Sequence, residues 1–153
     1  INVSGSSLPT RWPNVLTGIS FLTALLSHAF ALPEFALSWP TPNPAFSKGL
    51  GLNGFLQKTG PENPISSGAY GCVRNNGYKF HEGLDLFPIE RDSRGRAKDL
   101  VFAVMDGIVR HVNHTSSHSS YGKYIVLEHP SIKPAFYSLY GHLAEINDQI
   151  RLG

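Results

Sequence analysis

Four short runs of β-branched and aromatic residues most strongly limit what this 153-residue chain can fold into. The runs cover residues 101–105, 108–112, 124–129 and 135–143. Asp106 and Gly107, between the first two runs, form a pair typical of tight hairpin turns, and Pro130 closes the third run. No helical periodicity lies between the runs. We therefore expect an all-β fold, mainly an antiparallel sheet with a sandwich-like or half-barrel-like form.

The composition indicates one folded domain preceded by other segments. Hydrophobic residues make up 41% of the chain and charged residues 16%, which is typical of a globular protein. Residues 32–66 are rich in proline and glycine. Prolines at this density remove amide donors and disfavour helix, so we expect an extended approach segment. Trp39, Phe46 and Phe55 are expected to pin it onto the domain formed by residues 67–153.

The N-terminal part has the pattern of a secretory signal peptide. A short apolar run at residues 15–26 follows Arg11, and Ala29 and Ala31 form a small-residue cleavage site. The run is shorter than the about 20 apolar residues that a membrane span needs. We predict a signal peptide at residues 1–31 and a mature protein in the periplasm or outside the cell, without a membrane span. An uncleaved anchor and a buried helix are the alternatives.

Charge and cysteine content exclude several classes of protein. The net charge is only +2, and the densest basic stretch, residues 91–99, contains two aspartates and no aromatic residue. That stretch indicates a solvated loop, and no nucleic-acid partner is expected. Cys72 is the only cysteine, so neither an intrachain disulfide nor a cysteine-based zinc cluster can form.

His81 and Asp85 lie four residues apart, with Gly83 between them. In an extended strand four residues span roughly 13 Å, which is too far for two side chains to share one ion. Two ligands of one zinc ion each lie about 2 Å from the metal, so the backbone between them has to bend. Gly83 is the residue most able to bend. We interpret the two as a metal-binding pair, and the alternative is two surface residues beside a turn.

Alternation along residues 135–143 sorts the side chains of this run into two faces. One face carries Ser138, Tyr140 and His142, and the other carries Tyr137, Leu139 and Leu143. The second set is the more apolar one, so we expect it in the core. His142 is then expected on the opposite face, as an exposed or groove histidine.

The order of these pieces resembles a known family. A glycine-rich stretch from Ser67 to Arg74 leads into His81-x-x-x-Asp85, and three further motifs follow at residues 104–109, 121–129 and 137–143. This order is similar to that of the lysostaphin/LytM-type zinc metallopeptidases, which have the duplicated-hybrid-motif β fold and cleave peptide cross-links in bacterial peptidoglycan. The resemblance covers residues 67–153. It implies a Zn²⁺-dependent metalloendopeptidase whose partner is peptidoglycan.

Carried over by residue, the resemblance implies that His81 and Asp85 are two of three zinc ligands. It implies that His142 is a catalytic histidine that faces the scissile bond and does not bind the metal. The later His-x-His of the family, which supplies the third ligand and a second catalytic histidine, is missing from this sequence. The remaining candidates, which are expected on the surface and not on the metal, are His111, His114, His118 and His129. We therefore expect a C-terminally truncated domain that is inactive by itself.

Two other functions are considered for the same sequence. Some members of the family have lost zinc ligands and act as non-catalytic LytM-like modules that regulate cell-wall amidases. The retained His81 and Asp85 argue against this alternative. The same β architecture also occurs in sugar-transport phosphocarrier domains, but those are cytoplasmic, and the predicted signal peptide argues against them.

Overall fold

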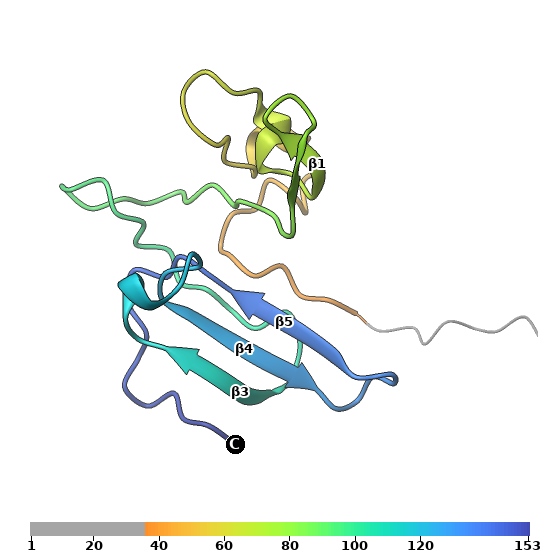
Figure 1. The fold of residues 1–153 in the computed structure, drawn as a ribbon, viewed down its shortest axis with the longest axis vertical. Helices are drawn as coiled ribbons and strands as arrows, with labels where there is room; N and C mark the ends of the chain where they lie inside the picture. Colours follow the sequence, from red (N-terminus) through yellow and green to blue (C-terminus); the bar gives the residue numbers. More distant parts are fainter. Residues whose placement is uncertain (1–35) are drawn as a thin grey trace, which may run out of the picture. The chain divides into compact units, whose positions relative to one another are not determined.

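The computed structural model describes residues 36–153, and the predicted signal peptide at residues 1–31 lies outside them. The described residues form two antiparallel sheets and three short 3-10 helices, which confirms the all-β prediction (Figure 1). The strands are β1 (Gly71–Arg74), β2 (Lys79–His81), β3 (Ile108–Asn113), β4 (Tyr124–His129) and β5 (Phe136–Tyr140). The 3-10 helices are η1 (Leu52–Gly54), η2 (Ile65–Gly68) and η3 (Ser116–His118). Within residues 36–153, no helix has the length and apolar character to cross a membrane.

The larger sheet has the order β3-β4-β5, so strands that follow one another in the sequence are hydrogen-bonded neighbours (Figure 1). β4 has the bounds that its β-branched run predicts. Its residues pair with β5 without interruption, from Ile125 opposite Tyr140 to His129 opposite Phe136. The pairing of β3 with β4 shifts by one residue between Val109 and His111.

The predicted hairpin at Asp106-Gly107 is wrong, because residues 101–105 do not form a strand beside β3. These residues form backbone hydrogen bonds with residues 38–40 instead. The amide of Phe102 donates to Pro40 O at 2.9 Å, and the amide of Ser38 donates to Val104 O at 2.7 Å. Gly107 lies against β4, where an added Cβ would be 2.8 Å from Glu128 O. Gly107 therefore allows its own backbone to approach the backbone of β4 closely, and it is not part of a hairpin turn.

The prediction for the two faces of β5 is also wrong. Tyr137 and Leu139, which alternation assigns to the core, are 52% and 45% exposed, and Ser138 is partly buried. The cause lies across the sheet, because Ser138 pairs with the buried Leu127 and hydrogen-bonds the fully buried His129. Because a buried polar group such as the His129 ring needs a hydrogen-bond partner, the face of β5 that carries the Ser138 hydroxyl is the inner one. The expectation that His129 lies at the surface is wrong for the same reason.

The proline-rich segment, as far as it is described, is more than an extended approach. Trp39 stacks on Phe46 with ring centroids 4.3 Å apart, and Phe55 packs edge-on against both rings. Two of the buried apolar residues in the described part of the chain, Ala45 and Leu56, belong to this segment. The three aromatic residues thus pack on one another in a cluster at the surface, in which Phe46 is 55% exposed. An isolated antiparallel β-bridge pairs Leu56 with Leu86 and so connects this segment to the chain that follows β2.

Candidate metal centre

The β1–β2 hairpin positions His81. Gly71 of β1 pairs with His81 at the end of β2, and the two strands are joined by a turn in which Asn75, Asn76 and Gly77 have φ values of 49°, 56° and 90°. Asparagine and glycine adopt this left-handed conformation at the lowest cost, so the Asn-Asn-Gly sequence suits the turn. The His81 residue is only 8% exposed.

Two backbone hydrogen bonds hold Asp85 beside His81. The amide of Asp85 donates to Gly68 O at 2.8 Å, and the amide of Gln57 donates to Asp85 O at 2.7 Å. As a result, Nε2 of His81 lies 3.5 Å from Oδ1 of Asp85. Two ligands on a tetrahedral zinc ion with bonds of about 2 Å lie about 3.3 Å apart. The structure therefore brings the two residues together at a spacing that fits one metal ion.

The chain bends at Gly83, between the two residues, as predicted. Gly83 has no positive φ, and a Cβ built on it would meet open space. Gly68 is the glycine that the site requires, because a Cβ there would lie 2.1 Å from Gln57 O and 3.4 Å from Cβ of Asp85. The sequence indicated Gly68 only as part of a glycine-rich stretch.

The imidazole of His81 is held in one tautomer. Its Nδ1 lies 2.8 Å from Ala69 O, and a carbonyl oxygen can only accept, so Nδ1 carries a proton. In the neutral ring the lone pair is then on Nε2, which faces Asp85. Histidines that bind metals are typically oriented by such a bond from the other ring nitrogen. An imidazole nitrogen and a carboxylate oxygen are both ordinary zinc ligands, so the donor pair fits Zn²⁺.

Arg74 contacts both members of the pair, although no sequence motif assigned it a role. Its Nη2 lies 2.5 Å from Oδ2 of Asp85 and 3.0 Å from Nε2 of His81. Its Nε donates to Ser67 O at 3.4 Å. The Arg74 and Asp85 side chains are 25% and 27% exposed, so this ion pair is partly shielded from water. The only sequence signal was its place at the end of the glycine-rich stretch.

A third metal ligand does not join this cluster. In the described part of the chain, no group of three or more His, Cys, Asp or Glu side chains could hold a metal ion. Catalytic zinc normally has three protein ligands, and the cluster supplies two. The three histidines at positions 111, 114 and 118 are exposed, as expected.

His142 lies beyond the end of β5, and the alternation of the strand does not extend to it. Its φ is 55°, its amide donates to Tyr121 O at 2.7 Å, and its side chain is exposed. Among the hydrogen bonds and ion pairs of residues 36–153, none joins His142 to His81 or Asp85. The structure thus brings the predicted metal pair together and gives no contact between that pair and His142.

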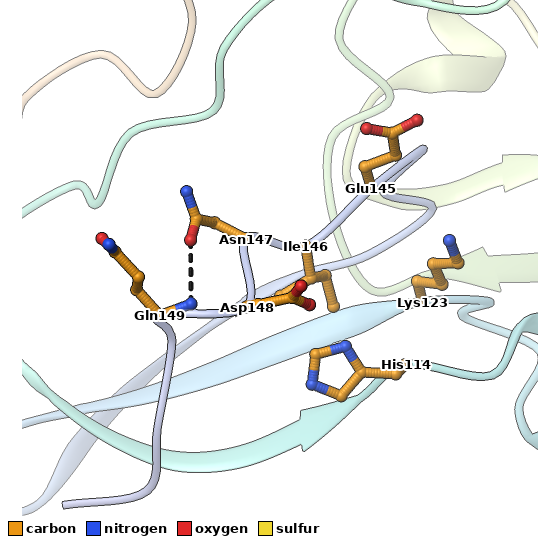
Figure 2. A pocket seen from close by; sticks show the side chains of 7 residues that line it. All are labelled: His114, Lys123, Glu145, Ile146, Asn147, Asp148 and Gln149. Atoms are coloured by element: carbon orange, nitrogen blue, oxygen red, sulfur yellow. Dashed lines mark hydrogen bonds between the residues drawn. The ribbon is translucent and has the colours of Figure 1, made fainter.

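A separate hollow of about 600 Å³ lies beside the larger sheet (Figure 2). Its labelled side chains come from His114 after β3, Lys123 before β4, and the loop at residues 145–149. The Lys123 ammonium donates to Ala144 O at 3.0 Å, and the amide of Gln149 donates to Oδ1 of Asn147 at 2.8 Å. These bonds shape the loop itself, and the mixed charges of the lining favour no single class of ligand.

Comparisons of the chain with protein-family models, with curated proteins and with solved structures found no match.

Proposed function

We propose that the protein is a zinc-dependent endopeptidase of the LytM type that hydrolyses peptide cross-links of bacterial peptidoglycan, in the periplasm or outside the cell. His81 and Asp85 are its metal ligands in this proposal. The observation that carries it is the 3.5 Å separation of Nε2 and Oδ1, together with the bond between Nδ1 and Ala69 O. The ordered motifs of the sequence supply the reaction class.

Each group around the pair has a definable task. Ala69 O fixes the imidazole so that Nε2 faces inwards, and Gly68 O and the Gln57 amide fix the backbone of Asp85. When bound, zinc supplies Lewis-acid activation of a carbonyl and lowers the pKa of water towards neutrality. The third ligand has to come from a residue outside this cluster.

Two exposed aromatic residues adjoin the pair in the sequence, and Phe80 lies on the face of β2 opposite to His81. Tyr70 directly follows Ala69, and Phe80 directly precedes His81. The two rings contact each other edge-on with centroids 5.2 Å apart, and the residues are 64% and 46% exposed. Exposed aromatic residues are typical of binding surfaces, because they offer apolar area at low entropic cost, so the two rings are a candidate contact for substrate on the other face of the hairpin.

The test is to measure zinc binding and peptidoglycan cleavage by the full-length protein, meaning the chain with the complete domain that the resemblance implies, and by three variants. His81→Ala and Asp85→Asn should both lose zinc and activity, because each removes a ligand. His111→Ala is the matched control, since His111 is exposed and stacks on Tyr124 away from the pair. Zinc binding that persists unchanged in His81→Ala and Asp85→Asn would contradict the proposal.

A second function is favoured by one observation, the contact of Arg74 with Nε2 of His81 and Oδ2 of Asp85. Asp85 has a cationic partner without any metal, which suits a non-catalytic LytM-like module that regulates cell-wall amidases. Such a module would show no zinc-dependent cleavage, and it would accelerate a separate amidase on the same peptidoglycan. Chelator-sensitive cleavage by the protein alone would exclude this alternative.

A further inference from the structure

Arg74 and a metal ion compete for the same electron pair. A neutral imidazole protonated at Nδ1 has a single lone pair in the ring plane, on Nε2. In the structure that lone pair faces Nη2 of Arg74 at 3.0 Å. The same guanidinium nitrogen lies 2.5 Å from Oδ2 of Asp85. A metal ion held by His81 and Asp85 therefore has to take the place of this N–H group.

The charge of Arg74, like its position, opposes metal binding at the His81–Asp85 pair. The guanidinium keeps its positive charge at all relevant pH values, and a divalent cation beside it would be repelled. Without a metal, however, the Asp85 carboxylate lies in a partly buried position and needs a positive partner. The Asp85 carboxylate is therefore neutralised either by the Arg74 guanidinium or by a metal ion, and not by both together.

We propose that Arg74 is a displaceable counter-ion that sets the metal affinity of the His81–Asp85 pair, an inference that rests on the proposed metal site. Its guanidinium neutralises Asp85 in the metal-free protein and moves away when zinc binds. The side chain has room to move, because it is 25% exposed and its remaining bond, from Nε to Ser67 O, is long at 3.4 Å. Removing Arg74 should therefore strengthen zinc binding.

The experiment measures zinc affinity by competition with a fluorescent chelator in the full-length protein and its variants. Arg74→Gln should bind zinc about tenfold or more tightly than the wild type, since groups that contact metal ligands alter affinity by 10–100-fold. Adding His81→Ala to Arg74→Gln should abolish the gain. Arg110→Gln is the matched control, because Arg110 forms a similar pair with Glu128 at 2.6 Å on β3 and β4, and its zinc affinity should equal that of the wild type.

Arg74→Lys covers the case in which Arg74→Gln does not fold. Lysine keeps the charge but lacks the planar fork, so its zinc affinity should lie above that of the wild type and below that of Arg74→Gln. If Arg74→Gln does not fold, tighter binding by Arg74→Lys supports the inference, and equal or weaker binding overturns it.

The outcomes separate this inference from the proposed function. If His81→Ala abolishes zinc binding while Arg74→Gln binds zinc no more tightly than the wild type, the counter-ion role is wrong and the metal pair stands. If zinc binds only to Arg74→Gln, and through His81, the inference is supported. If neither the wild type nor Arg74→Gln binds zinc through His81, both the metal pair and the inference are wrong.

Discussion

Nε2 of His129 lies 2.8 Å from Oγ of Ser138, inside the larger sheet, and the histidine is fully buried. The other ring nitrogen, Nδ1, lies 2.9 Å from Asp106 O. Oγ of Ser138 also lies 2.9 Å from the hydroxyl of Tyr140, which accepts the amide of Val104 at 2.8 Å. One buried network therefore joins β4, β5 and the chain before β3.

Ser138→Ala should lower the free energy of unfolding by about 1–3 kcal/mol, because it leaves the buried Nε2 of His129 without its partner. Urea unfolding followed by circular dichroism measures the change. Ser117→Ala, in the exposed helix η3, is the control and should stay within about 0.5 kcal/mol of the wild type. Equal stability of the two variants would show that the network contributes nothing.

The sequence predicted the part of the sheet in which local preference and burial agree. β4 is a β-branched run in the centre of the sheet, and its bounds are as predicted. The strand β5 lies within its predicted run, but its two faces were assigned wrongly because they were ranked by apolar content alone. The network of His129, Ser138 and Tyr140 buries polar groups in satisfied pairs, which alternation cannot reveal.

At the candidate metal centre, the spacing of His81 and Asp85 suggested the pair but not the way it is held. Asp85 is positioned by bonds to Gly68 and Gln57, which lie 17 and 28 residues earlier in the chain. Such contacts depend on the folded backbone and have no local pattern. The contact of Arg74 with the pair was not predicted for the same reason, because the folded β1–β2 hairpin places Arg74 beside His81 and Asp85.

Gly68→Ala should destabilise the protein by about 1–3 kcal/mol or more, as overpacking does, because the new Cβ would lie 2.1 Å from Gln57 O. It should also weaken zinc binding, since Gly68 O holds the amide of Asp85. Thermal unfolding and chelator competition measure the two effects. Gly83→Ala is the matched control, in the bend between His81 and Asp85, where the Cβ meets open space, so both quantities should change little. A Gly83→Ala variant as damaged as Gly68→Ala would refute this account.

Asp92 should titrate below its usual value. The backbone amide of Arg96, followed by the Arg96 side chain, lowers the pKa of the Asp92 carboxyl from 3.8. Since the folded pKa is the lower one, the contribution to stability is present above pH 3.8 and is lost as the pH falls through the folded pKa. Arg96→Gln should raise the pKa of Asp92 only part of the way, because the amides of Arg94 and Arg96 still donate. Carboxyl NMR titration of both proteins tests this, and an unchanged Asp92 pKa in Arg96→Gln would contradict it.

His142→Asn separates catalysis from metal binding. Asparagine tolerates the φ of 55° at this position, whereas alanine would add strain, so the substitution removes the imidazole and keeps the backbone. If His142 assists proton transfer in the proposed endopeptidase, the cleavage rate should fall by about 10²–10⁴-fold while zinc affinity stays that of the wild type. His118→Asn, at an exposed histidine of η3, controls for the loss of an imidazole and should leave both unchanged. Chelator competition and release of soluble peptidoglycan peptides give the two measurements. A full cleavage rate in His142→Asn would remove His142 from the mechanism and leave the His81–Asp85 pair as the part of the site that the geometry supports.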